Sequence, residues 1–420
     1  MTKRLTDLTT RTTHLLDLAT RTRFPYQAAT IRIGFSLVFA AFLIREWPHR
    51  RTLYGDHSPW SQEMALRVIG EDQAFTALAW WPGHWWFETV YHGTLLAALL
   101  LMVGWRTRAT SALFMVGVLS LEFRAPYLGD GGDSVFISMA AYLVLIRCGE
   151  VWSLDARRRR TGADDRSGPL LWQLTGVLLG LVLGLPDLGW AGLLWALWAG
   201  CGLRFAADRW FPQHEARTVL DGLAAMLHNV GMLVIAVQVC LIYATAGWYK
   251  IQGSRWQEGS ALHYALHLDH FRPWPMLSDL LTAGMIPVVL LAYATVVVQV
   301  AFPFTLASRK IKNALLAVMM AEHAGIAVVL GLPFLSAAMI VCDALFLPTA
   351  LLLGIDARLS RRGPRPGSAS EVPAAVPSIP EGRRPDPAKA PRPVTSAAGE
   401  RATRRGPDRG SWPEDRRDAE

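Results

Sequence analysis

Long apolar stretches constrain the fold of this chain more than any other feature. They recur in runs of roughly 16 to 27 residues, close to the length that an α-helix needs to cross the hydrocarbon core of a bilayer. Hydrophobic residues make up 52% of the 420 residues and charged residues only 18%, against about 45–50% and about 25% in soluble domains. The sequence therefore predicts an all-α fold, a polytopic transmembrane helical bundle, and excludes a soluble single domain, a secreted disulfide scaffold and a fibrous protein.

About ten spans are expected from these runs. They lie at about residues 27–44, 85–103, 109–124, 133–148, 170–185, 190–205, 224–247, 279–305, 313–332 and 335–354. A short turn joins the fifth span to the sixth, so 170–205 is expected to form a helical hairpin, spanning or re-entrant, and is a candidate insertion. The expected domains are a basic segment 1–24, a transmembrane domain 25–358 and a tail 359–420.

The basic residues predict the orientation of the chain in the membrane. Those in short loops, such as Arg157–Arg160 and Arg309, fall mostly on the side of the N-terminus. The positive-inside rule then places both termini in the cytoplasm of a multi-pass cell-membrane protein, although loop 45–84 carries four Arg on the expected outer side. Since loops and tail account for the net charge of +8, nucleic acid is not an expected partner; the lipid bilayer is.

The composition of the tail and the positions of the cysteines give two further predictions. From Arg361 onward the tail holds 11 of the 25 prolines and a single aromatic residue, so it cannot bury enough apolar surface to fold and is expected to be disordered. The four cysteines (Cys148, Cys201, Cys240 and Cys342) lie in or beside apolar runs without a C-x-x-C pair, which indicates neither a disulfide framework nor a zinc site.

Ionisable groups inside apolar runs are costly in a membrane and therefore become candidate site residues. Glu88 and His92 are four residues apart, so they share one helix face and form either a structural ion pair or a proton relay. Asp133 follows a glycine-rich turn and is expected to N-cap the fourth span. His323, next to Glu322, is either a site residue or part of an interhelical hydrogen bond.

Other polar residues in or near the spans have a structural and a functional interpretation. Arg32 is expected to snorkel to the inner headgroups, and Asp343 is either a site residue or packed in an interhelical hydrogen bond. His263, His267 and His270 have helical spacing that can ligate a metal, but an interfacial amphipathic helix is favoured and no metal site is expected.

The strongest candidate is Lys250, which closes a long apolar helix and is followed within nine residues by two glycines and Trp256. As an interfacial anchor, Lys250 extends its ammonium to water. As a partly buried amine it is disfavoured in its charged form, so the neutral amine can act as a general base.

Together these segments resemble the HTTM family, bacterial membrane proteins related to the transmembrane part of vitamin K-dependent γ-glutamyl carboxylase. The resemblance covers about residues 25–355 outside the 170–205 hairpin. It rests on Gln238, Tyr243, Ala246-Gly247-x-x-Lys250, Trp256 and Glu258-Gly259, on Glu322-His323 with Gly325, and on Gly129-Asp130-Gly131-Gly132-Asp133-Ser134 before the span that ends in Val151–Asp155.

The resemblance implies a site on the outer side of the membrane. In the carboxylase, a lysine there deprotonates a naphthoquinol, and oxygen then converts the quinol to an epoxide. The alkoxide formed on the way abstracts the γ-proton of a glutamate. Lys250 takes the place of that base. Reduced menaquinone or a vitamin K-like quinol is the implied cofactor. In the hypothesis of a quinol-binding membrane protein, the candidate supporting residues are Asp133, Glu88, His92 and His323, and the candidate cofactor contacts are Tyr243 and Trp256.

Two departures limit this comparison. The carboxylase has Asn-Asn-His-Ser where this chain has Gly131-Gly132-Asp133-Ser134, and its large extracytoplasmic domain has no counterpart, so full peptide carboxylation is not expected. Two alternatives stay open. One is a non-catalytic membrane scaffold or carrier with Lys250 as an anchor. The other is a proton-coupled transporter that uses Glu88, His92, His323 and Asp343.

Overall fold

The computed structural model describes residues 20–72, 74–125, 127–129, 131–162, 167–183, 189–210 and 215–362. These residues form helices, turns and loops without a strand, so the all-α prediction is confirmed for them. They belong to one compact unit that ends at Gly363. The predictions for most of segment 1–24 and nearly all of the tail 359–420 lie outside the described residues.

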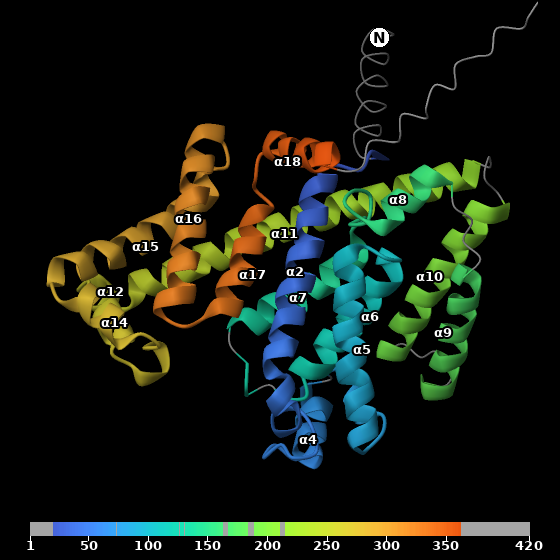
Figure 1. Ribbon diagram of the computed structural model, residues 1–420, viewed down its shortest axis with the longest axis horizontal. Helices are drawn as coiled ribbons and strands as arrows, with labels where there is room; N and C mark the ends of the chain where they lie inside the picture. The colour runs from blue at the N-terminus through green and yellow to red at the C-terminus, as the bar shows by residue number, and fades with distance from the viewer. Residues whose placement is uncertain are drawn as a thin grey trace, which may run out of the picture. The chain divides into compact units, whose positions relative to one another are not determined.

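Four helices of the N-terminal half pack side by side (Figure 1): α2 (Pro25–Glu46), α5 (His84–Val103), α6 (Thr107–Glu122) and α7 (Gly131–Leu145). Phenylalanines hold their common core, since Phe39 lies 5.5 Å from Phe114 and 5.3 Å from Phe136 between ring centroids. The connection from α2 to α5 contains α3 (Arg50–Leu53) and α4 (Gln62–Asp72). Gly104 ends α5 in a left-handed conformation, which glycine adopts without strain.

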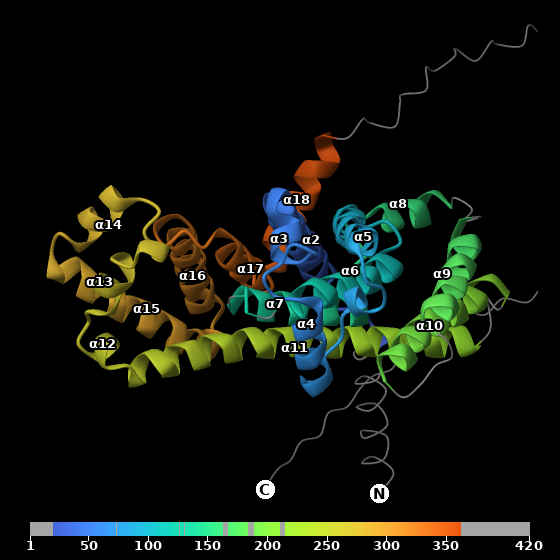
Figure 2. The ribbon, with the colours of Figure 1, turned by 90° about the horizontal axis from the view of Figure 1, so that it is seen from below.

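A second group consists of α15 (Met285–Thr305), α16 (Arg309–Val329) and α17 (Pro333–Ala344). Because α17 also packs against α2 and α7, it joins the two groups. Helix α11 (Glu215–Gln252) runs past both groups to the short helices α12 (Ser254–Gln257) and α13 (Ala261–Leu266), as Figure 2 shows. Its 38 residues extend about 57 Å at about 1.5 Å per residue.

The segment expected to form a hairpin consists of α9 (Ser167–Leu183) and α10 (Trp190–Trp210), which pack against each other. Trp172 and Trp198 stack at 4.2 Å, and each indole nitrogen donates to the other residue's carbonyl oxygen at 2.9 and 2.8 Å. Gly176 and Gly202 leave room for the two rings, because a Cβ on either glycine would lie within 3 Å of an indole. The antiparallel pair is therefore held by a reciprocal tryptophan contact.

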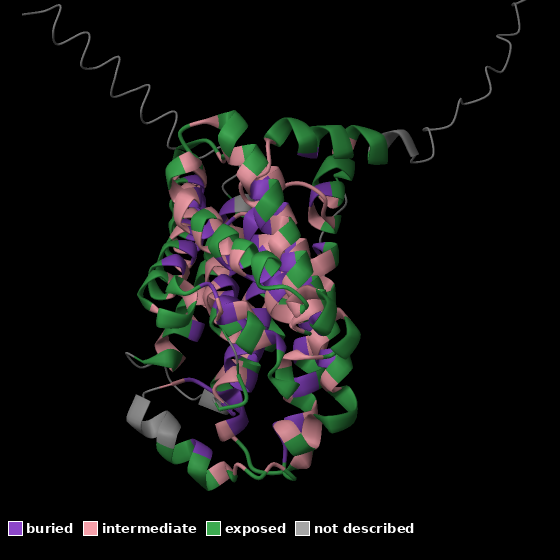
Figure 3. Cartoon of the chain, turned by 90° about the vertical axis from the view of Figure 1, so that its left-hand side faces the viewer, coloured by how far each residue is buried: buried purple, intermediate pink, exposed green. Residues whose placement is uncertain are grey.

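Buried residues gather on the inward sides of the helices and exposed residues on the outward sides (Figure 3). The exposed residues include many large apolar ones, such as Val177, Leu233, Val237, Ile286 and Leu290. Contiguous exposed apolar surface of this kind is unusual on a soluble monomer. The presence of several exposed apolar helices is thus compatible with a membrane protein.

By length and hydropathy, five helical segments of the described chain are able to cross a membrane. These are Pro25–Leu53, His84–Val103, Arg217–Gln252, Met285–Thr305 and Arg309–Val329. A sixth is added if the pair Pro333–Ala344 and Thr349–Leu359, bent by 102°, is one span. The count of ten and the orientation of the termini stay predictions.

Two of the expected spans differ from the structure. Segment 279–305 is divided into α14 (Pro275–Thr282) and α15, because Gly284 is extended between them. Segment 335–354 is divided into α17 and α18 (Thr349–Arg362); Pro348 stands at the break, where it cannot donate a helical hydrogen bond.

Arg32 does not snorkel, contrary to the prediction. It is fully buried, and its guanidinium donates to the carbonyl oxygens of Leu101 at 3.0 Å and Trp152 at 2.6 Å. The Leu101 carbonyl oxygen lies in the last turn of α5 and also accepts from the Gly104 amide at 3.0 Å. Arg32 therefore adds a second hydrogen bond there and ties the C-terminal end of α5 to α2.

Candidate functional site

The side chain of Lys250 heads a chain of hydrogen bonds that links three helices. Its Nζ donates to Oε1 of Gln299 on α15 at 2.6 Å, and Nε2 of Gln299 donates to Oε1 of Glu322 on α16 at 2.8 Å. Nζ also lies 5.2 Å from the centroid of the Trp256 ring, within the range of a cation–π interaction. Lys250 and Glu322 are half-buried. Because its Nζ is hydrogen-bonded to Gln299 and lies near the Trp256 ring, the amine of Lys250 does not extend freely into bulk solvent.

A second chain lies one residue further along α16. The hydroxyl of Tyr243 donates to Oδ1 of Asp343 on α17 at 2.8 Å and lies 3.1 Å from Nε2 of His323. Since Tyr243 has one hydroxyl hydrogen and gives it to Asp343, Nε2 of His323 carries a hydrogen and donates to the tyrosine oxygen. Among the described residues, Nδ1 of His323 and Oδ2 of Asp343 have no hydrogen-bond partner. All three side chains are buried.

The helices position these two chains next to each other. Tyr243 and Lys250 are seven residues apart, about two turns of α11, so they lie on one face. Gly247 stands between them, and a Cβ there would lie 2.5 Å from Cγ2 of Val300 on α15. This close approach of α11 and α15 lets Lys250 reach Gln299. We call Tyr243, Lys250, Gln299, Glu322, His323 and Asp343 the six-residue network.

Glu88 and His92 belong to a different cluster, at the junction of α2, α3 and α5. Glu88 accepts hydrogen bonds from Arg50 at 2.9 and 3.0 Å and from Arg51 at 2.7 Å. Nε2 of His92 accepts from the indole of Trp47 at 3.0 Å. Nδ1 therefore carries the hydrogen and points to the backbone carbonyl oxygen of Glu88 at 2.8 Å, with the Glu88 carboxylate at 3.4 Å. The Glu88 carboxylate is therefore paired with the two arginines, and His92 lies beside it with its own hydrogen bond to the Glu88 backbone.

Asp133 lies inside the first turn of α7, which begins at Gly131. The expected N-cap position is therefore wrong, because the helix starts two residues earlier than the sequence indicated. Burial, followed by the negative charges of Glu122 and Asp133, raises the pKa of Tyr54. The next helix along the chain after α7 is α8 (Leu154–Thr161).

The three histidines at 263, 267 and 270 do not share a helix. Helix α13 ends at Leu266, and His270 lies in a separate 3₁₀ turn, Asp269–Phe271. Among the residues that the structure describes, no group of three His, Cys, Asp or Glu side chains is placed to hold a metal ion.

Gln299 is the residue that the sequence reasoning missed. It is 5% exposed in the middle of α15, where it bridges Lys250 and Glu322. A polar amide inside an otherwise apolar run was the available signal, since such side chains hydrogen-bond across helices in membranes.

No protein-family model, no curated protein and no solved structure matches this chain.

Proposed function

We propose that this chain is an integral membrane protein that binds a lipid-soluble hydroquinone, with Lys250 as the general base. The observation that carries the proposal is the Lys250–Gln299–Glu322 chain, with contacts of 2.6 and 2.8 Å between its polar atoms. It couples an amine to a carboxylate through one amide, so the amine is oriented and a positive charge on it is balanced.

The chemistry expected of Lys250 is a single proton transfer. A neutral amine takes the hydroxyl proton of the hydroquinone, which leaves a hydroquinone anion beside an ammonium group. Gln299 keeps accepting a hydrogen bond from that ammonium, and both the Glu322 carboxylate and the Trp256 ring stabilise its charge. The neighbouring surfaces of α11 and α15 are apolar and exposed, including Trp248 and Val297, which suits the approach of a ligand from lipid.

The test is oxygen-dependent epoxidation by the purified protein in liposomes with reduced menaquinone. In this reaction one oxygen atom of O₂ enters the quinone epoxide and the other leaves as water. Lys250→Met removes the amine but keeps the aliphatic stem, and we expect it to lose at least tenfold in rate. Lys310→Met, a change at an exposed lysine on α16, is the matched control and keeps the wild-type rate. An absence of turnover above empty liposomes, or equal rates for Lys250→Met and wild type, contradicts the proposal.

A proton-coupled transporter is the second candidate, and the Tyr243–His323–Asp343 chain favours it. Two titratable side chains converge on one hydroxyl between three helices, and each keeps one polar atom unpaired among the described residues. Buried ionisable groups of this kind occur in the proton pathways of transporters. Under this alternative, vesicles show proton uptake driven by a potassium diffusion potential, His323→Gln abolishes it, and Lys250→Met shows no epoxidation defect because the wild type has no such activity.

A further inference from the structure

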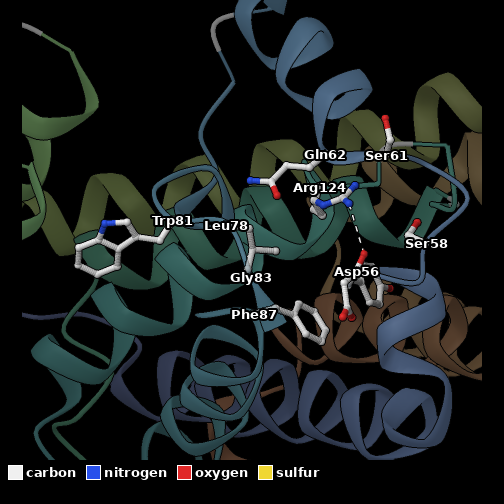
Figure 4. Close-up of a pocket in the computed structure, with 11 residues that line it drawn as sticks. Asp56, Ser58, Ser61, Gln62, Leu78, Trp81, Gly83, Phe87 and Arg124 are labelled. Carbon is white, nitrogen blue, oxygen red and sulfur yellow. Dashed lines mark hydrogen bonds between the residues drawn. The ribbon is translucent and has the colours of Figure 1, made fainter. Parts of the chain in front are cut away.

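A cavity of about 280 Å³ lies at the end of the N-terminal helices, beside α4 (Figure 4). The cavity is separate from the six-residue network, because none of the six residues lines it. Its lining comes from the α3–α4 connection, α4, the segment before α5, α5 itself and Arg124. Polar side chains form one part of the lining and apolar ones another. The polar part includes Ser58, Ser61 and Gln62, and the apolar part includes Trp81 and Phe87.

Arg124 is the one cation among the residues that line this cavity. It is only 6% exposed, and within the part of the chain that the structure describes its guanidinium makes a single long hydrogen bond, from Nη2 to the carbonyl oxygen of Gly55 at 3.5 Å. Nη1 has no partner within the described chain. A buried guanidinium presents five N–H donors, and leaving such donors and their charge unmatched is strongly unfavourable.

The carboxylate nearest in the lining does not neutralise Arg124. Asp56 points away from the guanidinium in Figure 4, and the ion-pair contact recorded for it is with His57 at 3.9 Å. The guanidinium instead extends into the space between Ser58, Ser61 and Gln62.

We infer that this cavity binds an oxyanion, a carboxylate or phosphate group, on the guanidinium of Arg124. Planar guanidinium matches both groups through paired hydrogen bonds. The hydroxyls of Ser58 and Ser61 and the amide of Gln62 add donors. The apolar side chains Trp81 and Phe87 contact the hydrocarbon part of the ligand. Because Trp81 belongs to an aromatic cluster of the kind found at membrane interfaces, the oxyanion has two sources, a phospholipid headgroup or a soluble anion.

The first experiment is thermal unfolding of the full chain in uncharged detergent, with potassium phosphate or sodium benzoate compared with chloride at equal ionic strength. A ligand that binds only the folded state raises the Tm. We expect a rise of a few °C for wild type and none for Arg124→Met. Arg124→Met is expected to fold, because it removes an unmatched buried charge. Arg67→Met, a change at an arginine of α4 whose side chain is 75% exposed, keeps the wild-type response.

A second variant tests whether the ligand of the cavity is negatively charged. Asp56→Asn removes a negative charge from the lining without touching Arg124, so anion affinity should rise by roughly three- to tenfold. A fall in affinity contradicts an anion on Arg124.

The source of the oxyanion is separated by comparing dihexanoyl phosphatidylglycerol with dihexanoylglycerol, which lacks the phosphate. A Tm rise with the phospholipid alone that needs Arg124 supports a headgroup. A rise with benzoate or inorganic phosphate alone that needs Arg124 supports a soluble anion. The inference is overturned if no oxyanion shifts the Tm, or if Arg124→Met and wild type respond equally.

Discussion

At the residue scale, single polar atoms decide how the second group of helices is joined. The hydroxyl of Tyr243 is the shared partner of His323 and Asp343, so one atom on α11 connects α16 and α17. Most buried polar groups in folded proteins are hydrogen-bonded, because an unpaired one costs free energy. Tyr243, one of the implied cofactor contacts, is therefore also a structural residue.

Tyr243→Phe tests this role directly. Removal of the hydroxyl leaves Nε2 of His323 and Oδ1 of Asp343 without that partner, and we expect a loss of about 1–3 kcal/mol in unfolding free energy. Denaturant unfolding in detergent measures the loss. Tyr293→Phe is the matched control, because Tyr293 also donates one hydrogen bond, to the carbonyl oxygen of Gln257 at 2.6 Å, but is 43% exposed. Equal losses in the two variants would show that burial of the Tyr243 hydroxyl has no special importance.

At the scale of elements, the approach of α11 to α15 positions Lys250. Gly247 lets the two helices come close beside Val300, and small residues at helix interfaces serve this purpose in membranes. The contact between Nζ of Lys250 and Gln299 depends on that spacing, since both side chains project from the facing surfaces of these helices.

Gly247→Ala should separate the helices. The added methyl group would lie 2.5 Å from Cγ2 of Val300, so we expect the variant to lose about 1–3 kcal/mol of stability through overpacking, and any Lys250-dependent activity to fall with it. Gly325→Ala on α16 is the control, because a Cβ there meets nothing within 4 Å; helix propensity predicts a gain of up to about 1 kcal/mol. The measurement is the unfolding free energy of both variants under the same conditions. If both variants are more stable than wild type, the proposed overpacking at Gly247 is wrong.

At the scale of the whole molecule, the helices differ greatly in length. Helices α6 and α7 contain 16 and 15 residues, about 24 and 22 Å at about 1.5 Å per residue, which is less than the roughly 30 Å hydrocarbon core. Helix α11 is much longer than that core, so a bilayer-spanning α11 is expected to tilt or to protrude. Apolar character along the chain therefore does not by itself state how many helices cross the bilayer.

The expected orientation is open to a labelling experiment in intact cells. In a background with all four cysteines replaced by alanine, we expect His57→Cys to react with a membrane-impermeant maleimide, because it lies in the loop on the expected outer side and its side chain is 68% exposed. Thr161→Cys, at the exposed end of α8, should react only after lysis. The reverse pattern would refute cytoplasmic termini.

The amino-acid sequence by itself determined that the described chain is helical and where most helices lie, because apolar runs of this length satisfy their backbone hydrogen bonds only internally. It also singled out Lys250 and His323 as polar residues in or at the end of apolar runs, while Tyr243 was named through the family resemblance. Only the tertiary structure decided which polar atoms meet. Lys250 and Gln299 are 49 residues apart and Tyr243 and Asp343 are 100 apart, so their contacts depend on how whole helices pack. The same reason assigned Glu88 and His92 to another cluster and brought Arg124 into a cavity, since no local spacing along the chain encodes such encounters.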